Sequence, residues 1–235
     1  MKARKDIGNS LTGRHLFLCE LAGALAGEKV LDLGCGFGWF EEHALGRGCA
    51  SVVGVDTDEV RLECARRQAP DASFIRGDAT ALPVDGSYKV IAMFDFLEHL
   101  PRDLVPEVLR NAAAALDEEG RLLVSVPYRG LVSTLLDPAF YFGHRHYTVA
   151  NLSALLEKGG FSVRRVMYGG GMWEHLSMIL LYVFKWVFAR EMPFEAFLEK
   201  KRRAEYLPPR LSPRSTSATM FTEAAKRRDP GRPGR

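Results

Sequence analysis

The stretch Val30-Leu31-Asp32-Leu33-Gly34-Cys35-Gly36-Phe37-Gly38 decides the fold class. A short apolar run ends in an acidic residue, and a glycine-rich turn leads into a helical pattern over 37–45. Glycine lets the backbone turn tightly and approach a ligand with no Cβ in the way. In open α/β sheets, ligands bind beyond the carboxyl ends of the strands. The stretch therefore predicts a buried strand over 29–33 with a ligand site at its end.

Apolar runs and helical patterns alternate along the chain on either side of this stretch. Further strands are predicted over 51–55, 73–76, 88–94, 121–126 and 161–168, and helices over 11–26, 58–68, 101–116 and 149–158. This alternation indicates βαβ units, a mainly parallel sheet and helices on both faces. We therefore predict an α/β, Rossmann-like doubly wound domain over 1–172 with 217–225, where a last strand over 218–224 pairs antiparallel.

Length and charge narrow the class of protein further. The 235 residues suit one decorated α/β domain, and the net charge of +3 is too small to indicate nucleic acid as a partner. Residues 190–235 hold 12 Lys/Arg against 6 Asp/Glu, so this basic end follows a slightly acidic body. The four cysteines form no C-x-x-C pair, and the N-terminus lacks the apolar core of a signal peptide, which favours a cytoplasmic protein. The Pro/Gly-rich basic tail over 226–235 is predicted to be disordered.

Three acidic residues end three successive predicted strands. Asp32 precedes the glycine turn, Asp56 ends the second strand and Asp78 follows the third. A carboxylate at Asp32 suits a cationic ammonium group, one at Asp56 can accept hydrogen bonds from both ribose hydroxyls, and one at Asp78 can accept from an adenine amino group. Together these residues predict a site for a cationic adenosyl ligand.

An NAD-type oxidoreductase is the main alternative, because its G-x-G-x-x-G turn is similar. The third glycine of that pattern falls on Trp39, and the last glycine is Gly38. The carboxylate of Asp32 would also repel a pyrophosphate. Asp56 does not discriminate, since a nicotinamide cofactor would use the same residue.

From about Val30 to Phe161 the chain resembles the class I S-adenosylmethionine-dependent methyltransferases. The resemblance implies a seven-stranded sheet and S-adenosyl-L-methionine as cofactor. Asp32, Gly34 and Gly36 would hold its methionine part, Asp56 its ribose, Asp78 and Ala79 its adenine, and Phe94 would line the sulfonium side. Gly38, and Thr57 next to Asp56, complete the expected cofactor-binding residues.

An oxygen nucleophile usually needs a base, and two histidines are candidates. His99 follows the fourth predicted strand, beside the expected methyl site, and His146 lies in the long connection over 127–147. The run over 95–99 also resembles the metal motif of ubiquinone-pathway O-methyltransferases, where Asp95, Glu98 and His99 would share one face of a helical turn. No fourth ligand is evident, so no metal is assigned.

The segment 173–207 is predicted to be a helical insertion. Its core over 176–189 is apolar nearly all round, and Lys200-Lys201-Arg202-Arg203 follows. Such a helix must be buried against protein or lie in a membrane interface. It is therefore expected to act as a lid, a homodimer interface or a peripheral contact with the inner face of the membrane. An apolar cap favours O-methylation of a small apolar, lipid-linked or glycan-type metabolite, and a non-catalytic cofactor-binding subunit is the third hypothesis.

Overall fold

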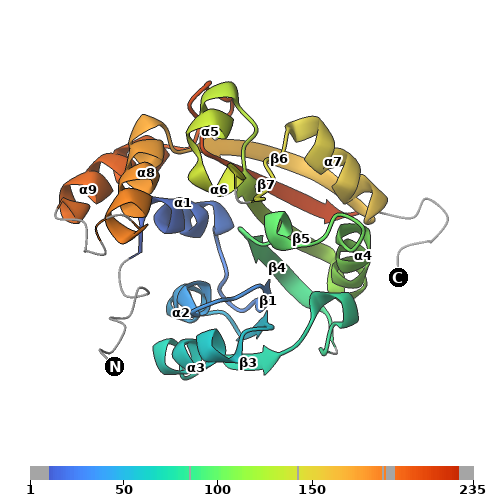
Figure 1. Ribbon diagram of the computed structural model, residues 1–235. Coiled ribbons are helices and arrows are strands. Elements are labelled where there is room, and N and C mark those ends of the chain that lie inside the picture. Colours follow the sequence, from blue (N-terminus) through green and yellow to red (C-terminus); the bar gives the residue numbers. More distant parts are fainter. Residues whose placement is uncertain (1–10, 85, 142, 187, 189–193, 228–235) are drawn as a thin grey trace. The chain divides into compact units, whose positions relative to one another are not determined.

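The computed structural model describes residues 11–84, 86–141, 143–186, 188 and 194–227 (Figure 1). The chain divides into two compact units. The sheet unit comprises Ala24–Val126, Tyr147–Val166 and Phe221–Arg235, and the helical unit comprises Met1–Gly23, Pro127–His146 and Met167–Met220. Each unit is described by itself below.

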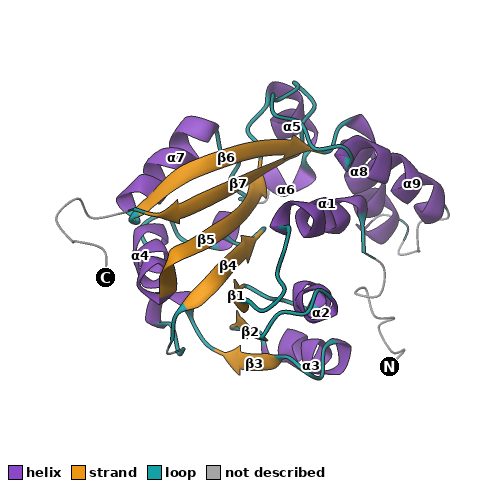
Figure 2. Cartoon of the chain, turned by 180° about the vertical axis from the view of Figure 1, so that it is seen from behind, coloured by secondary structure: helices purple, strands orange, loops and turns teal. Residues whose placement is uncertain are grey.

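Seven strands form one mixed sheet in the order β3-β2-β1-β4-β5-β7-β6. Their bounds are β1 Lys29–Leu33, β2 Ser51–Asp56, β3 Ser73–Arg76, β4 Tyr88–Phe94, β5 Leu116–Pro127, β6 Phe161–Gly169 and β7 Thr219–Lys226. The pairs β1–β2, β2–β3, β1–β4 and β4–β5 are parallel. Figure 2 shows β7 running opposite to β6. The predicted Rossmann-like α/β fold is thereby confirmed.

The strand order reverses at β1, and this reversal positions the ligand site. β2 and β3 follow β1 on one side, whereas the chain returns to place β4 on the other side. Ligands of open α/β sheets bind at such a switch point, beyond the carboxyl ends of the strands. Leu31, Leu33, Ile91 and Met93 of the two central strands are fully buried, so the strands that carry the site are held by the core.

Four α-helices of the described residues belong to the sheet unit. They are α2 Trp39–Gly46, α3 Glu59–Gln68, α4 Val105–Ala115 and α7 Val149–Lys158. α2 and α3 lie on one side of the sheet, and α4 and α7 lie on the other (Figures 1 and 2). Two of these helices begin with a side-chain cap: the Asp58 carboxylate accepts from two amides at the start of α3, and the Thr148 hydroxyl accepts from the Asn151 amide in α7.

The helical unit contains α1 Gly13–Ala22, α5 Leu131–Leu136, α6 Pro138–Tyr141, α8 Met172–Trp186 and α9 Glu195–Tyr206. The predicted long connection thus holds two short helices, and the predicted insertion contains two helices. Within the described ranges, no helix is both long and apolar enough to span a bilayer.

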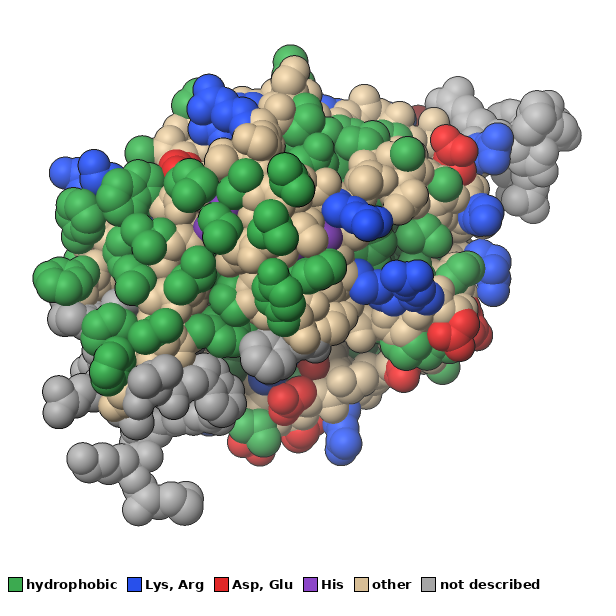
Figure 3. Space-filling view, turned by 45° about the horizontal axis from the view of Figure 1, so that its top comes forward, with side chains coloured by type: hydrophobic (Ala, Val, Ile, Leu, Met, Phe, Trp, Pro, Cys, Tyr) green, Lys and Arg blue, Asp and Glu red, His purple; other side chains and the backbone are tan. Residues whose placement is uncertain are grey.

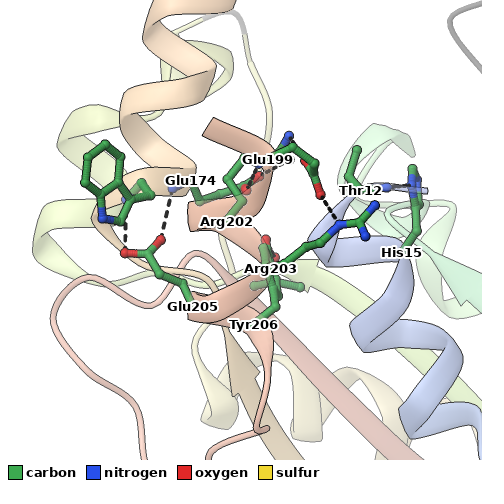
Figure 4. A network of polar contacts seen from close by, with 10 residues as sticks. Thr12, His15, Glu174, Glu199, Arg202, Arg203, Glu205 and Tyr206 are labelled. Carbon is green, nitrogen blue, oxygen red and sulfur yellow. Dashed lines mark hydrogen bonds and ion pairs between the residues drawn. The ribbon is translucent and has the colours of Figure 1, made fainter. Parts of the chain in front are cut away.

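Tyr206 and an ion pair join the helices of this unit (Figure 4). Tyr206 is fully buried, its ring lies 5.4 Å from that of Phe17 in α1, and its hydroxyl is 3.0 Å from that of Thr219. The Arg202 guanidinium in α9 donates twice to the buried Glu174 carboxylate of α8, at 2.6 and 3.1 Å. The helices are therefore connected by aromatic packing and by a buried bidentate ion pair.

Several element boundaries differ from the predictions. The first helix ends at Ala22 because Gly23 has a positive φ of 68°, and the helix predicted from residue 101 begins at Val105. β5 starts five residues earlier than predicted, at Leu116. The predicted last strand is present as β7, which extends to Lys226, whereas the rest of the predicted tail from residue 228 lies outside the described residues.

Candidate functional site

Three glycines shape the turn that follows β1. Gly34, Gly36 and Gly38 all have positive φ values, of 82°, 55° and 83°. Side chains strain this region of backbone conformation, so the turn depends on glycine. A Cβ on Gly34 would also lie 2.5 Å from the Phe96 ring, while nothing lies within 4 Å of a Cβ built on Gly36. The turn is therefore closely packed at Gly34 and open at Gly36, where a ligand can approach the backbone.

Asp56 connects the end of β2 to this turn. Its Oδ2 accepts a hydrogen bond from the Gly36 amide at 2.9 Å, and its Oδ1 accepts from the Asp58 amide at 2.9 Å. Two predicted cofactor-binding residues, Gly36 and Asp56, are thus brought into direct contact. Thr57, exposed between Asp56 and Asp58, lies at the same edge.

Asp32 and Glu41 are buried acids beside the turn. Asp32 is 3% exposed and Glu41 in α2 is fully buried. Within the described ranges, Asp32 Oδ1 and both carboxyl oxygens of Glu41 have no hydrogen-bond partner. Burial, and then the charge of Asp56, raise the pKa of Asp32 to about 8, while burial and the charge of Asp32 raise the pKa of Glu41 well above its usual value. Among the described residues, no positive charge contributes to the pKa shifts of these two acids, and a cation beside Asp32 would supply one.

Gly54 makes room for Glu41. It lies opposite Asp32 in the parallel register of β1 and β2. A Cβ at Gly54 would overlap Glu41 Oε1 and would lie 2.9 Å from Sγ of the buried Cys35. Burial, followed by the charge of Glu41, raises the pKa of the Cys35 thiol, so Cys35 is a neutral packing residue. Glu41 was not predicted from the sequence, although the Val-Gly-Val pattern of β2 was a signal for close packing at residue 54.

Asp78 and Ala79 follow β3, as predicted, at the short helix η1 Ala79–Ala81. The Asp78 carboxylate accepts from the Thr80 amide and hydroxyl, both at 2.8 Å, and these bonds lower the pKa of Asp78. Asn111 of α4 donates to the carbonyl of Ala79 at 3.1 Å. The segment is fixed at its backbone, and Asp78 is ionised at neutral pH.

Phe94 belongs to an aromatic cluster at the end of β4. Its ring centroid lies 5.7 Å from the stacked ring of Trp39 and 4.9 Å from the edge-on ring of Phe40. Phe94 is 7% exposed, Phe40 is fully buried and Trp39 is partly exposed. The cluster packs the start of α2 against β4, and it places aromatic faces beside the glycine turn.

The residues after β4 adopt a sharp turn. Asp95 has a φ of 49°, which is unusual for a residue with a side chain, and the Ser125 hydroxyl donates to its Oδ1 at 2.9 Å. His99 is exposed at the end of the short helix η2 Leu97–His99. In the part of the chain that the structure describes, no three His, Cys, Asp or Glu side chains come together as metal ligands. Asp95, Glu98 and His99 therefore do not form such a group here.

His146 belongs to the helical unit. Its side chain is 1% exposed, its Nε2 lies 2.9 Å from Asp137 Oδ2, and its Nδ1 lies 3.4 Å from the Thr134 hydroxyl. Both ring nitrogens thus have partners. The neighbouring Tyr147 belongs to the sheet unit, where its hydroxyl donates to the carbonyl of Leu97 at 3.1 Å. Asp137 was not predicted from the sequence, because its partner His146 lies nine positions further along the chain, beyond α6.

Known proteins resemble this chain over part of its length. Residues 30–120 match the family model described as "Methyltransferase domain". The chain is 37% identical over 109 residues to a ubiquinone biosynthesis O-methyltransferase of Bordetella parapertussis, covering 43% of each protein. It is 34% identical over 162 residues to a probable S-adenosylmethionine-dependent methyltransferase of Mycolicibacterium smegmatis, covering 66% of this chain and 61% of the relative. The match thus spans about half the length of these curated relatives.

Solved structures share the fold. An S-adenosylmethionine-dependent methyltransferase from Mesorhizobium loti aligns with a TM-score of 0.63 at 19% identity, over 91% of this chain and 98% of its own. The magnesium protoporphyrin IX methyltransferase of Synechocystis PCC 6803 with bound SAH aligns with a TM-score of 0.61 at 19% identity, over 91% and 84%. Residues 30–120 thus match a methyltransferase domain, and the chain is similar to class I S-adenosylmethionine-dependent methyltransferases in sequence and in fold. These matches support the methyltransferase prediction over the NAD-type oxidoreductase.

Proposed function

We propose that this protein transfers the methyl group of S-adenosylmethionine to an oxygen atom of a small acceptor that has an apolar part. The observation that carries the proposal is the acidic edge at the switch point, where Oδ1 of the buried Asp32 has no hydrogen-bond partner among the described residues, beside an open glycine turn. Such an edge suits a cationic ligand and repels a pyrophosphate. The relatives named ubiquinone biosynthesis O-methyltransferase support oxygen as the methylated atom.

The residues of the edge would share the binding of the cofactor. Asp32, Gly34, Gly36 and Gly38 would hold its methionine part, Asp56 and Thr57 its ribose, Asp78 and Ala79 its adenine, and Phe94 would line the sulfonium side. When bound, S-adenosylmethionine supplies a methyl group activated by the positive sulfur. The protein's own residues provide position, charge and exclusion of water.

The base is proposed among the two predicted histidines. His99 is exposed after β4 and is therefore able to meet an acceptor. His146 is buried, and both of its ring nitrogens have partners, so it would need to exchange one of them to take a proton. We therefore place His99 first and His146 second as the group that removes the proton of the acceptor hydroxyl.

We propose an apolar part for the acceptor because of the surface of the helical unit. Large apolar side chains are exposed on its helices: Leu131, Leu135, Phe140, Tyr141, Met172, Leu176, Leu181 and Phe197. Apolar side chains gather on one face in Figure 3. Exposed apolar surface of this extent marks an interaction site. A small apolar or lipid-linked acceptor suits it better than a glycan.

We also propose that the helical unit contacts an anionic membrane surface. The unit holds 14 Lys/Arg against 8 Asp/Glu, a formal charge of +6, whereas the sheet unit has −3. Lys201 Nζ lies 5.5 Å from the centre of the half-buried Trp173 ring and 5.6 Å from that of the exposed Phe197, so a cation accompanies two aromatic rings. This combination of charge and aromatic surface suits lipid headgroups better than a homodimer or a lid.

Incubation with methyl-labelled cofactor and a metabolite extract tests the reaction. The labelled product should carry its new methyl group on oxygen and should contain an apolar chain or ring. Asp56→Ala should abolish labelling, whereas Asp71→Ala, an exposed acid after α3, should not. Cofactor binding with no labelled product in any extract, alone or with membranes, would instead favour a non-catalytic cofactor-binding subunit.

A further inference from the structure

Glu41, in the first turn of α2, is a buried acid for which the proposed reaction has no role. Its side chain is fully buried, and neither of its carboxyl oxygens has a hydrogen-bond partner among the described residues. In the same part of the chain, Oδ1 of the buried Asp32 has no partner either. Buried polar groups without partners are rare and costly. Three such oxygens beside the cofactor site therefore indicate that the two acids act together.

The backbone places the two carboxyl groups next to each other. Asp32 and Gly54 are paired in the parallel register of β1 and β2, so side chains at these two positions lie on the same face of the sheet, about 4.8 Å apart. Gly54 has no side chain, and Oε1 of Glu41 lies where its Cβ would be. α2 packs against both strands (Figures 1 and 2). The carboxyl of Glu41 therefore fills the space beside the Asp32 side chain.

The groups around Glu41 supply negative charge only. Asp32 of β1 and Asp56 of β2 act on it, and the buried Cys35 is a neutral thiol. The three arginines of α3 contact other groups of that helix or of its cap: Arg61 pairs with Asp58, Arg66 with Glu59, and Arg67 contacts Cys64. Two buried carboxylates at such close range cannot both be ionised at low cost.

Cofactor binding would leave one proton on this pair of acids. Burial raises the pKa of both acids, and the charge of Asp32 raises that of Glu41 further. A cation beside Asp32 favours its ionised form, so Asp32 gives its proton to the solvent. The new charge on Asp32 makes ionisation of Glu41 still more costly, so Glu41 stays neutral. A neutral carboxyl has an O–H donor, and Asp32 Oδ1 is an acceptor that needs one.

We propose that Glu41 is a positioning residue for the cofactor: in the bound state its neutral carboxyl donates a hydrogen bond to the Asp32 carboxylate and holds it toward the ammonium group. The inference rests on the proposed placement of that ammonium beside Asp32. A hydrogen bond from O–H to a carboxylate is strong, so it makes the ionised form of Asp32 less costly in a buried position. One negative charge then faces one ammonium.

The pH profile of S-adenosylhomocysteine binding tests this proposal. The calorimetric affinity should rise with pH until Asp32 is ionised in the free protein. Glu41→Leu removes the donor, so it should move this rise to higher pH by about one unit or more and weaken binding at pH 7 by about tenfold, since a hydrogen bond to a charged group contributes this much. The ligand's own amino group titrates alike in all the proteins compared.

The direction of the shift decides between a donor and a second charge. The amide of glutamine can also donate, so Glu41→Gln should rescue the wild-type profile. Glu63→Leu, on the exposed face of α3, is the control. A shift to lower pH in either Glu41 variant would show that Glu41 is a negative charge and would overturn the inference. An unchanged profile in Glu41→Leu would overturn it as well.

Infrared spectroscopy gives a second test that does not depend on the leucine variant. Wild-type protein saturated with S-adenosylhomocysteine at pH 8 should show the carbonyl band of a protonated carboxylic acid, and Glu41→Gln should lack it. A wild-type protein without such a band, or a band of equal intensity in both proteins, would overturn the inference.

Asp32→Asn separates this inference from the proposed cofactor site. If Asp32→Asn binds S-adenosylhomocysteine as tightly as the wild type at pH 8, the placement of the ammonium is wrong and the inference falls with it. If Asp32→Asn binds weakly and Glu41→Leu keeps the wild-type profile, only the inference is wrong. Neither result depends on an acceptor, so transfer to oxygen is tested separately by the labelled product.

Discussion

At the scale of single residues, the charge balance around Asp32 is the main feature of the site. Asp32, Glu41 and Asp56 influence one another, and the first two are buried. Buried acids usually have hydrogen bonds or a counter-ion, because an isolated charge is costly in a medium of low polarity. These acids would therefore favour binding of a cationic cofactor, and we expect them to destabilise the free protein.

Cofactor binding should release a proton from Asp32. With a pKa of about 8, Asp32 is largely protonated at pH 7, and a cation placed beside it favours the ionised form. Calorimetry at pH 7 in buffers of different ionisation enthalpy should show more proton release for the wild type than for Asp32→Asn. Comparing the two proteins cancels the titration of the cofactor's own amino group. Equal release by both proteins would contradict the placement of the ammonium beside Asp32.

Glu41→Gln should stabilise the free protein. The folded-state pKa of Glu41 lies well above its ordinary value of 4.5, so the folded state binds more protons and loses stability as the pH rises above 4.5. Glutamine has the shape of the neutral acid and does not ionise, so the variant should not lose stability in this way. In thermal unfolding at pH 7, the free energy of unfolding of the variant should exceed that of the wild type by at least about 1.4 kcal/mol, the equivalent of one pKa unit. At pH 4 the two free energies should differ little. Glu63→Gln, on the exposed face of α3, should show no such trend; a variant less stable than wild type at every pH would refute this account.

At the scale of elements, the contact between α2 and β2 depends on Gly54. Gly54→Ala places a Cβ against Glu41 and Cys35. Overpacking of this kind costs about 1–3 kcal/mol, so urea unfolding should show a loss of that size. The double variant Gly54→Ala with Glu41→Ala should recover part of it, because the overlapping carboxyl is gone. Additive losses in the double variant would show that Glu41 is not the obstructing group.

The link between α8 and α9 depends on the ion pair of Glu174 and Arg202. Glu174→Ala leaves the guanidinium, 17% exposed, without its main partner. Breaking a buried pair costs about 3–5 kcal/mol, and we expect the lower end because Glu199 also accepts from Arg202 at 3.0 Å. Glu195→Ala, exposed at the start of α9, is the matched control. Equal thermal stability of the two variants would contradict a structural role for the pair.

Strand positions could be predicted because apolar runs and glycine turns are local signals. The boundaries of the helices were harder to predict. The sequence predicts one helical segment over 173–207, because apolar residues continue past Trp186, whereas the structure contains the two helices α8 and α9. The need for glycine at positions 169 and 171 is explained only by packing. A Cβ at Gly169 would clash with Tyr206, and a Cβ at Gly171 would clash with Glu205, both in α9. Such contacts depend on residues more than thirty positions away.

The candidate site likewise contains residues that could be predicted from local signals and residues whose position depends on the tertiary structure. The positions of Asp32, Asp56 and Asp78 could be predicted because each lies at or near the carboxyl end of a strand, and parallel strands bring these ends to one edge. Glu41 resembled an ordinary acid at a helix start, and its burial depends on a glycine in another strand. The roles assigned to the site residues stay predictions until a ligand is bound.

At the scale of the whole molecule, charge and exposed apolar surface are concentrated in the helical unit, at +6 against −3 for the sheet unit. The protein should co-sediment with phosphatidylglycerol vesicles more than with phosphatidylcholine vesicles, and added salt should weaken the binding. Phe197→Ser should reduce it severalfold, whereas Leu211→Ser, which removes another exposed apolar side chain of this unit, should not. Two results would contradict membrane contact and indicate self-association instead. One is equal sedimentation without vesicles, and the other is a dimer in ultracentrifugation that depends on Phe197.

The most direct measurement of the central claim is a crystal structure of the protein with S-adenosylhomocysteine. We predict the ribose hydroxyls at the Asp56 carboxylate, the amino acid part over Gly34 and Gly36 beside Asp32, and the adenine near Asp78 and Ala79. Electron density for the ligand elsewhere, with this edge empty at saturating concentration, would contradict the account.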